Sequence, residues 1–496
     1  MILTVKSQNT KSYIVEEERN LLSLLQQHGY LPDAVCGGNG ICGKCLVEIE
    51  GKGKVLACKT IIDADMTVIL QEKDEEFSVL GYVEEQRIEN DNLGKEYAIA
   101  IDIGTTTLAL SLVDIGKKKV LHTYTSTNSQ RAYGADVISR IQASNDGKKD
   151  ELKARIQNDL CQGIRALSNT CRIEIEQISL VVLAGNTTML HLLMGYSCET
   201  LGVYPFTPIK IEALEDSGNI VFGSPDMKHM RVKTLPGISA FVGADIVSGL
   251  YANDFLRKEK PCLFIDLGTN GEMAIGTKEK IIVTSVAAGP AFEGGNITHG
   301  MGSVKGAICG VKIAGENRVL FDTVGDGSPI GICGTGVMET VAELLKTRLI
   351  DISGKLDEEY FEDGFLLVTA DDGTDIVMTQ KDIREFQLAK AAIRAGVETL
   401  ISQYGTSCEE IETVYLAGGF GYFMDVKKAV EIGMLPVKLQ EKTVAVGNAS
   451  LNGGVKYVLQ EDANTVCETL VKISTEVLLA SDETFQKIYM EHMMFE

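Results

Sequence analysis

The 496-residue chain is 45% hydrophobic and 23% charged, a balance typical of ordinary globular proteins, and its length predicts about two to four domains. Its net charge of −22 argues against a nucleic-acid partner, because phosphate binding needs clustered lysine and arginine. The sequence contains neither a run of about 18 apolar residues nor a signal-peptide pattern, so we expect no membrane span and a cytoplasmic protein.

The first 70 residues read as short strands around one helix. We predict strands at "ILTVKS", "KSYIVEEE", "KCLVEIEG" and "MTVILQE", and an amphipathic helix at "NLLSLLQQHG" that ends at Gly29. Together they predict a small, half-open sheet that wraps around one helix, with a loop rich in glycine and cysteine at its rim.

That loop, "AVCGGNGICGKCLVEI", contains two competing motifs. Gly38 to Cys45 reads G-x-x-x-x-G-K-C, which differs from a phosphate-binding P-loop only in its last residue. A P-loop follows a buried strand and opens a helix, whereas "LPDAV" is a poor strand and "LVEIE" alternates as a strand does. Cys45 also replaces the hydroxyl that would hold magnesium, and three thiols would have no role beside a phosphate. The pattern therefore favours a metal site.

Four cysteines, Cys36, Cys42, Cys45 and Cys58, fall within 23 residues with the spacing C-x₅-C-x₂-C-x₁₂-C. Plant-type ferredoxins hold a 2Fe–2S cluster with C-x₄-C-x₂-C and a distant fourth cysteine. A four-cysteine zinc site is the alternative, but such sites usually consist of two short cysteine pairs. The segment resembles the 2Fe–2S ferredoxin-like family, which implies that these four cysteines ligate the cluster and that residues 1–80 form a β-grasp domain.

Residues 72–91, "EKDEEFSVLGYVEEQRIEND", hold eight acids and two bases. This composition predicts an acidic linker over residues 81–95. The next domain then covers residues 96–496.

Two segments of this large domain share the motif I-D-[IL]-G-T and predict a duplication: "AIDIGTTTLALSLVD" (100–114) and "FIDLGTNGEMAIG" (264–276). Each has an apolar strand before the glycine and alternation after it, which predicts a strand–turn–strand hairpin. A Gly-Thr turn presents N–H groups and hydroxyls to an anion, and an aspartate at the strand end can hold a phosphate-bound magnesium ion. Asp102 and Asp266 are therefore candidates for magnesium or water, and the candidate phosphate-binding residues are Gly104, Thr105, Thr106, Gly268, Thr269 and Asn270.

A third motif, "VYLAGGFG" (414–421), is a buried strand that opens into Gly418 and Gly419, where an adenosine could approach the backbone. The three motifs, in this order, resemble the actin-like ATPase superfamily of sugar kinases, heat-shock chaperones and actin (ASKHA). The resemblance covers about residues 97–460. It implies an α/β, ribonuclease H-like fold with duplicated lobes at about 96–255 and 256–460, a C-terminal tail, and binding of ATP and Mg²⁺.

Within the same resemblance, "FVGADIVSGLYAN" (241–253) corresponds to the first connecting helix. The superfamily often places an acid near the attacking water there, which makes Asp245 a catalytic candidate. The alternative is an ordinary capping or surface aspartate.

A ferredoxin-like module in front of an ATPase implies electron transfer made possible by ATP. The whole chain resembles the reductive activators of corrinoid proteins, and "LAGNTTMLHLLMG" (183–195) and "AAGPAFEGGNI" (287–297) also look like members of this family. The resemblance implies ATP-dependent reduction of a cobalt(II) corrinoid protein to cobalt(I), an electron donor such as reduced ferredoxin or flavodoxin, and a homodimer. Larger members carry a middle domain between the two modules, and we expect it to be missing because only about 20 residues are available there.

Three other functions are compatible with parts of the pattern. The chain could activate a radical dehydratase or another low-potential acceptor, act as a small-molecule kinase with a redox domain, or carry electrons with a degenerate ATPase fold. The ferredoxin-like module, the lack of a clear sugar pocket, and the intact Asp102 and Asp266 argue against them in turn.

Overall fold

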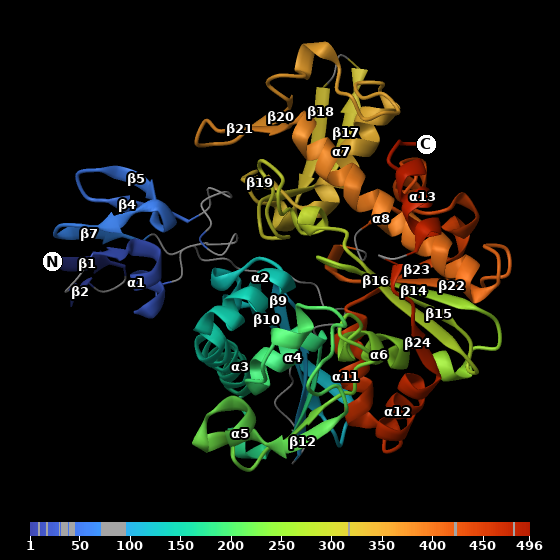
Figure 1. Cartoon of the computed structure of the whole chain (residues 1–496), viewed down its shortest axis with the longest axis horizontal. Helices are drawn as coiled ribbons and strands as arrows, with labels where there is room; N and C mark the ends of the chain where they lie inside the picture. The colour runs from blue at the N-terminus through green and yellow to red at the C-terminus, as the bar shows by residue number, and fades with distance from the viewer. Residues whose placement is uncertain are drawn as a thin grey trace.

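The protein is a mixed α/β molecule with a small N-terminal unit and a much larger unit (Figure 1). Neither the predicted linker at 81–95 nor Cys36 and Cys42 can be compared with the structure, because they fall outside the residues that it describes. The computed structural model describes residues 1–7, 10–15, 18–28, 30, 38, 45–70, 96–315, 318–420, 424–479 and 482–496.

The N-terminal unit is a sheet in the strand order β2-β1-β7-β4-β5 with one helix packed on it. β1 runs parallel to β7 and antiparallel to β2, while β4 runs antiparallel to β5 and β7. The four predicted strands and the predicted helix are confirmed. The bounds are β1 (Ile2–Lys6), β2 (Thr10–Ile14), β4 (Leu46–Ile49), β5 (Gly53–Leu56), β7 (Met66–Ile69), α1 (Leu21–Gln27) and a small pair, β3 (Arg19–Asn20) with β6 (Ile61–Ile62).

The first lobe of the large unit contains a sheet in the order β10-β9-β8-β11-β13-β12. β8, β9 and β10 form an antiparallel meander, and β11 and then β13 add to β8 in parallel. The strands are β8 (Tyr97–Ile103), β9 (Thr107–Asp114), β10 (Lys119–Thr127), β11 (Ile178–Gly185), β12 (Leu214–Ser217) and β13 (Arg231–Thr234). The helices are α2 (Val137–Ala143), α3 (Lys149–Cys171), α4 (Thr187–Met194), α5 (Gly218–Phe222) and α6 (Ala244–Ala252).

The second lobe repeats this pattern. β14, β15 and β16 form an antiparallel meander, and β22 and then β23 add to β14 in parallel. The two sheets therefore share the strand arrangement of a meander with two parallel strands added to its first strand. The strands are β14 (Cys262–Leu267), β15 (Gly271–Gly276), β16 (Ile281–Val286), β22 (Thr413–Ala417), β23 (Thr443–Gly447) and β24 (Ser474–Glu476).

Between β16 and β22 the chain builds a further layer, seen at the top of Figure 1, from β17, β18, β19, the β20–β21 hairpin and α7. Its bounds are β17 (Ala307–Ala314), β18 (Arg318–Thr323), β19 (Gly331–Ile332), α7 (Gly334–Lys346), β20 (Phe365–Thr369) and β21 (Asp375–Met378). The remaining helices are α8 (Gln380–Tyr404), α10 (Val426–Glu431), α11 (Ala449–Leu459), α12 (Ala463–Ile473) and α13 (Glu483–Glu491).

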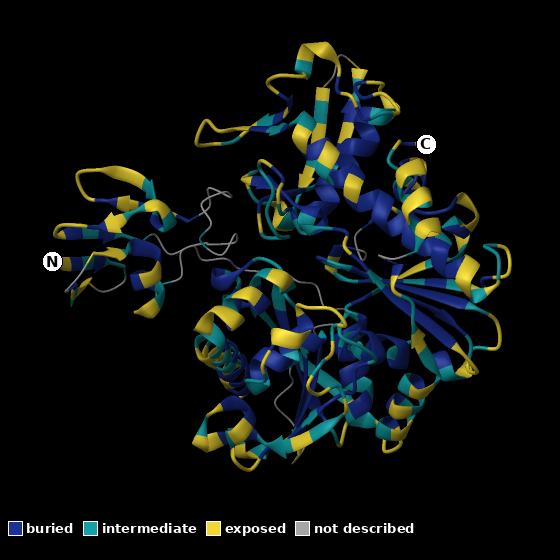
Figure 2. Cartoon of the chain, in the orientation of Figure 1, coloured by how far each residue is buried: buried dark blue, intermediate teal, exposed yellow. Residues whose placement is uncertain are grey.

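Buried residues lie along the central strands and in the helices that cover them, while exposed residues are found toward the outside (Figure 2). One apolar core lies between the first sheet and α3 with α4, and a second joins α6 to β14 and α12. α11 packs against α6 and β8, so the chain returns to the first lobe after completing the second sheet. Among the described helices, none combines the length and the apolar character that a membrane span requires.

The N-terminal unit touches the large unit through the end of α1. The side-chain amide of Gln26 donates to the Ala132 carbonyl at 2.6 Å, and Arg155 on α3 donates to the Gln26 carbonyl at 2.9 Å. Ala132 lies in the short helix η2 (Ser129–Tyr133), directly after β10. The contact therefore falls on the segment that follows the β8–β9–β10 meander.

Candidate active site

The two predicted hairpins are present, and each turns at its glycine. The Gly104 N–H donates to the Thr107 carbonyl at 3.0 Å between β8 and β9, and the Gly268 N–H donates to the Asn270 carbonyl at 3.0 Å between β14 and β15. A Cβ on Gly104 would lie 2.6 Å from the Thr107 oxygen, so the first turn requires glycine. Both turns leave hydroxyl-bearing side chains at the strand ends.

Asp102, at the end of β8, is held by the N-terminus of α11. The Asn448 side chain donates to its Oδ2 at 2.8 Å, and the Ser450 hydroxyl donates to its Oδ1 at 2.7 Å. Burial raises the pKa of Asp102, and these two hydrogen bonds oppose the increase. Asn448 and Ser450 are site residues that none of the sequence motifs predicts.

A second asparagine that caps a helix, as Asn448 does, supports the first turn. Asn186 caps α4 and donates to the Thr105 hydroxyl at 3.0 Å. The buried guanidinium of Arg140 donates to the Thr105 carbonyl at 2.6 Å. The repeated segments "GNTT" (185–188) and "GNAS" (447–450), each between a strand and a helix, are the signal by which Asn186 and Asn448 could have been found.

Asp102, Asp245 and Asp266 come together from β8, the first turn of α6 and β14, and all three are only partly exposed. Burial raises the pKa of Asp245 to about 7, with a further contribution from the charge on Asp102. Burial, then the charges on Asp245 and Asp102, raise the pKa of Asp266 to about 8. Asp245 therefore lies beside Asp102 and Asp266 in one group of carboxylates, the acidic centre, and is not an isolated surface carboxylate.

Glu272, on β15, is a fourth carboxylate of this acidic centre that sequence analysis did not identify. Burial raises its pKa well above the usual range, and the charges on Asp245 and Asp266 add to the effect. Carboxylates this close and this shielded from water are stabilised by a proton or by a cation. Among the described residues, no three histidine, cysteine or acidic side chains are grouped to hold a metal by themselves, so a magnesium ion here would need water or phosphate oxygens as well.

Gly418 and Gly419 follow β22 beside the end of β14. Gly418 has a φ of +91°, and a Cβ there would lie 2.5 Å from the Leu267 carbonyl oxygen and 2.9 Å from Asp266 Oδ1. Among the residues that the structure describes, none has an atom within 4 Å of the Cβ position of Gly419. The first glycine therefore lets the third motif approach Asp266, and the second has no close neighbour in the described part of the chain.

Glu293 joins the two hairpins. Its Oε2 accepts from the Thr269 hydroxyl at 2.6 Å and from the Thr106 hydroxyl at 3.1 Å. Burial raises the pKa of Glu293, while the two hydroxyls and the charge on Arg140 oppose the increase. Glu293 was also missed as a site residue, although it lies in the "AAGPAFEGGNI" segment that looked like part of the family pattern.

Of the four predicted cluster ligands, the structure describes Cys45 and Cys58. Cys45 precedes β4 and is buried, and Cys58 lies in the short helix η1 (Ala57–Lys59) and is half-buried. The Ala57 N–H donates to the Cys45 carbonyl at 2.8 Å, so the two cysteine-bearing segments are adjacent. Gly38, with a φ of +85°, would place a Cβ 3.8 Å from the Cβ of Cys58, so this point of the glycine loop lies beside Cys58.

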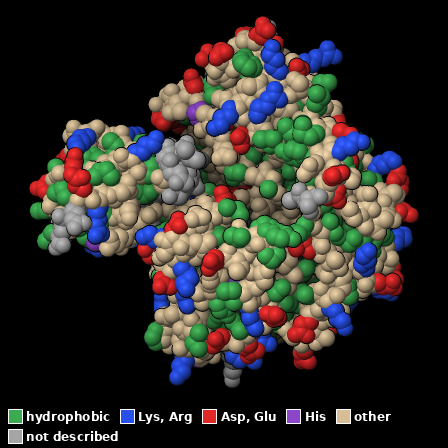
Figure 3. Space-filling view, in the orientation of Figure 1, with side chains coloured by type: hydrophobic (Ala, Val, Ile, Leu, Met, Phe, Trp, Pro, Cys, Tyr) green, Lys and Arg blue, Asp and Glu red, His purple; other side chains and the backbone are tan. Residues whose placement is uncertain are grey.

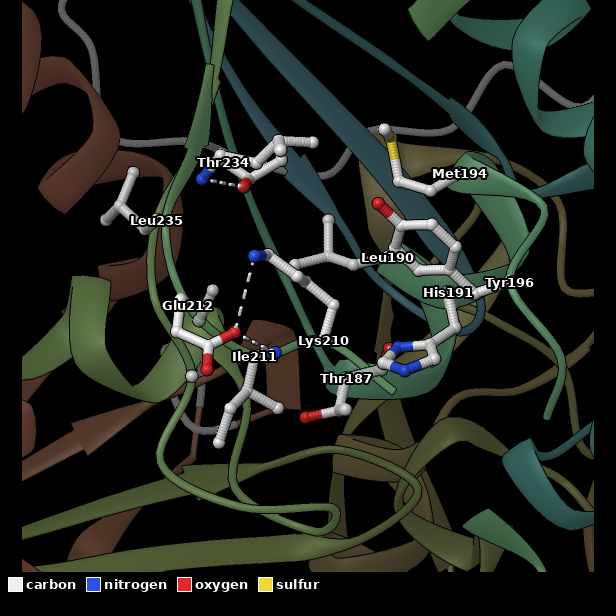
Figure 4. A pocket seen from close by; sticks show the side chains of 13 residues that line it. Thr187, Leu190, His191, Met194, Tyr196, Lys210, Ile211, Glu212, Thr234 and Leu235 are labelled. Atoms are coloured by element: carbon white, nitrogen blue, oxygen red, sulfur yellow. Dashed lines mark hydrogen bonds and ion pairs between the residues drawn. The ribbon is translucent and has the colours of Figure 1, made fainter. Parts of the chain in front are cut away.

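A separate cavity of about 30 Å³ lies between α4 and the chain before β12 (Figure 4). That volume holds about one or two water molecules. His191 in its wall accepts from the Ile209 N–H through Nε2, and its Nδ1 lies 2.7 Å from the Thr187 carbonyl oxygen. None of the predicted site residues lines this cavity, so the cavity is distinct from the acidic centre. Both ring nitrogens of His191 already have partners.

Comparison with known proteins assigns both parts of the large unit. Residues 260–496 match the model described as the C-terminal domain of RACo, the ASKHA domain, and residues 97–258 match the model of the RACo middle region. The expectation that the middle domain is missing is therefore wrong. The sheet of residues 97–258 has the same strand arrangement as that of the second lobe, so the sequence pattern alone does not separate the middle region from the ATPase fold.

Two curated proteins are similar over most of their length. The corrinoid activation enzyme RamQ of Eubacterium limosum is 35% identical over 422 residues, covering 80% of this chain and 70% of the relative. The [Co(II) methylated amine-specific corrinoid protein] reductase of Methanosarcina barkeri is 30% identical over 428 residues, covering 79% of this chain and 76% of the relative.

A solved structure of a reductive activator for corrinoid, iron–sulfur protein superposes with a TM-score of 0.75 at 28% identity. The match covers 100% of this chain and 98% of the solved one. The two molecules therefore share their overall architecture.

Proposed function

We propose, from the premise that this chain belongs to the RACo family of corrinoid activation enzymes, that it is an ATP-dependent reductive activator. It transfers a low-potential electron to an inactive cobalt(II) corrinoid protein and regenerates the cobalt(I) form that accepts methyl groups. The observation that carries the proposal is the meeting of Asp102, Asp245 and Asp266 between two hydroxyl-bearing hairpins, in a chain related to two corrinoid-activating enzymes.

In this proposal the acidic centre binds Mg²⁺ and ATP, and residues 96–496 act as one ATPase with two lobes. Asp102 and Asp266 hold magnesium directly or through water, and Asp245 orients the attacking water. The close approach of Gly418 to β14, and the lack of a described neighbour within 4 Å of the Cβ position of Gly419, support adenosine binding there. The phosphates are bound by the two turns, through Gly104, Thr105, Thr106, Gly268, Thr269 and Asn270.

The N-terminal unit carries the electron. Cys36, Cys42, Cys45 and Cys58 ligate a 2Fe–2S cluster, which supplies one electron when bound. The sheet order with a single packed helix and the adjacency of Gly38, Cys45 and Cys58 support a ferredoxin-like β-grasp domain.

Coupling to ATP is needed because the electron moves uphill. Plant-type clusters have potentials of about −400 mV, and for one electron every ~59 mV uphill requires about 1.4 kcal/mol. The partners in this proposal are a corrinoid protein of a methyltransferase system and a donor such as reduced ferredoxin or flavodoxin. The enzyme acts in the cytoplasm as a homodimer.

The test is anaerobic reduction of a cobalt(II) corrinoid protein by the full chain, a low-potential reductant and Mg·ATP. The cobalt(I) absorption band should appear with ATP and should be absent without ATP or with Cys42→Ser, which breaks the electron path. Lys44→Ala, which would inactivate a P-loop, should leave ATP hydrolysis nearly unchanged. ATP hydrolysis with cobalt left oxidised under all these conditions would point instead to a different low-potential acceptor, such as a radical dehydratase.

A further inference from the structure

Glu293 is held in place by a tightly closed loop. It ends the short helix η8 (Pro290–Glu293), and Gly294 follows with a φ of +74° in the left-handed region. The Gly294 N–H donates to the Ala291 carbonyl at 3.0 Å, and a Cβ on Gly294 would lie 2.3 Å from the Met301 carbonyl oxygen. These contacts restrict the backbone next to Glu293, so the loop fixes the position of the Glu293 carboxylate.

The same loop is packed against the predicted adenosine element. Phe292, which is buried, stacks on Phe420 with ring centroids 4.7 Å apart and meets the edge of Phe386 at 5.9 Å. Phe420 directly follows Gly418 and Gly419. The loop that carries Glu293 therefore contacts the third motif and, through its carboxylate, both hairpins.

The contact between Glu293 and the hairpins uses the groups that would bind phosphate. Each threonine hydroxyl has a single proton to donate. Thr106 and Thr269 both donate to Glu293 Oε2, at 3.1 and 2.6 Å, so neither can donate to a phosphate at the same time. A carboxylate and a phosphate are both anions, and the buried cation of Arg140 interacts with the charge on Glu293.

We propose that Glu293 is an internal anion that occupies the phosphate-binding position of the nucleotide-free chain, and that the phosphates of ATP displace it. Displacement frees the hydroxyls of Thr106 and Thr269 for the phosphates and breaks the bridge between the two hairpins. The phosphates then supply the negative charge that faces Arg140. Glu293 is thus a positioning residue that links nucleotide arrival to rearrangement of the lobes, and this inference rests on the proposed function.

A different arrangement of the same groups predicts the opposite effect. If Thr106 and Thr269 held magnesium through their lone pairs and donated their protons to Glu293, the carboxylate would support nucleotide binding. Loss of its charge would then weaken the binding of a magnesium–nucleotide complex.

The experiment measures binding of Mg·AMP-PNP, a non-hydrolysable ATP analogue, to the full chain and to Glu293→Gln by calorimetry. Glutamine keeps the shape but removes the charge, and neutral hydrogen bonds are about half as strong as charge-assisted ones. We expect Glu293→Gln to bind Mg·AMP-PNP about 3- to 30-fold more tightly, with AMP affinity changed less than about twofold. In hydrolysis assays the KM for ATP should fall accordingly.

Two further variants separate competition from general electrostatics. Glu272→Gln removes a charge from the same acidic centre, but Glu272 has no hydrogen bond to either threonine among the described contacts, so it should not reproduce the gain. In a Thr269→Val background, Glu293→Gln should lose most of its effect on affinity, because the hydroxyl for which Glu293 and the phosphates compete is absent.

The outcomes distinguish the inference from the function on which it rests. If the native chain binds Mg·AMP-PNP but Glu293→Gln binds it equally or more weakly, or if Glu272→Gln gives the same gain, the displacement model is overturned and the nucleotide site stands. If neither the native chain nor any variant binds the analogue, the nucleotide site itself is wrong and both proposals fall.

Discussion

Asp102 is a carboxylate on which distant parts of the chain converge. It lies on β8, yet its two hydrogen-bond donors, Asn448 and Ser450, are 346 and 348 residues away at the start of α11. Asp245 and Asp266 add two more carboxylates whose pKa values are raised by burial and by the charge on Asp102, and the charge on Asp245 adds to the increase at Asp266. Without a cation these carboxylates repel one another when they are charged. The stability of the nucleotide-free protein should therefore depend on pH.

We predict that the chelator-treated, nucleotide-free protein becomes less stable as the pH rises from about 4 to 8. Asp266 has a folded-state pKa of about 8, above the ordinary value of 3.8 for a free aspartate carboxyl, so the folded chain binds more protons in this window. Stability therefore falls as pH rises through the folded pKa. Asp266→Asn should flatten the melting temperature against pH, as measured by calorimetry, while Ser168→Ala, which removes a buried hydroxyl far from the site, should shift the curve without flattening it.

The opposite slope, or one that Asp266→Asn leaves unchanged, would contradict the raised pKa. Saturating Mg·ATP should also flatten the native curve, because a cation compensates the same charges. This second arm ties the pH dependence to the acidic centre, since carboxylates elsewhere would not respond to the nucleotide.

At the scale of elements, the hairpins and the duplicated sheet could be predicted from sequence because their signals are local. The motif I-D-[IL]-G-T and the alternation after it lie within 15 residues, and each predicts one turn. Glu293 and Thr106, by contrast, are 187 residues apart, and no local pattern pairs them. The role of α11 was missed for the same reason, because the helix supports a strand of the other lobe.

The packing of α11 on α6 offers a test of this arrangement. A Cβ on Gly453 would lie 2.0 Å from the Ser248 carbonyl oxygen, so Gly453→Ala must push α11 away from α6. Overpacking of this kind typically costs about 1–3 kcal/mol of stability. We predict a lower melting temperature together with a loss of ATP hydrolysis per folded molecule, because α11 holds Asp102 and α6 carries Asp245.

Gly163→Ala on α3 is the matched control. Its Cβ would lie 2.8 Å from a Leu110 methyl group, so it also crowds a helix against a sheet, but it contacts none of the residues at the site. It should lower the melting temperature while leaving hydrolysis per folded molecule near the native value. Equal losses of activity in the two variants would show that α11 has no special role in positioning Asp102.

At the scale of the molecule, the N-terminal unit and the predicted phosphate site share a connection. Gln26 at the end of α1 contacts Ala132 in η2, and the Asn128 N–H just before η2 donates to the Thr106 carbonyl at 2.9 Å. On the face shown in Figure 3 the molecule is hollowed between the first lobe and the upper layer of β17–β21. Two hydrogen bonds, one at each end of η2, therefore connect the first hairpin with the N-terminal unit. They offer a route by which a change of the hairpin on nucleotide binding would reach the predicted cluster.

We predict that the cobalt(II) form of the corrinoid partner stimulates ATP hydrolysis and that its methylated form does so much less. A ligand shifts a conformational equilibrium only by its differential affinity for the two states, so the protein alone should hydrolyse ATP slowly. The measurement is phosphate release by the full chain with each form of the corrinoid protein, under anaerobic conditions. Equal stimulation by both forms would contradict recognition of the oxidised cobalt.

The same anaerobic assay tests whether ATP hydrolysis supplies the free energy for electron transfer or whether bound ATP only permits the transfer. Uphill transfer needs the free energy of hydrolysis in every cycle, so a non-hydrolysable analogue should support at most one turnover of cobalt(I) formation. Asp266→Ala should behave like the omission of hydrolysis, and Cys42→Ser should hydrolyse ATP without reducing cobalt, because the two variants interrupt different halves of the coupling. Sustained cobalt(I) formation with the analogue would mean that the nucleotide acts only through binding, as an allosteric ligand of the N-terminal electron carrier.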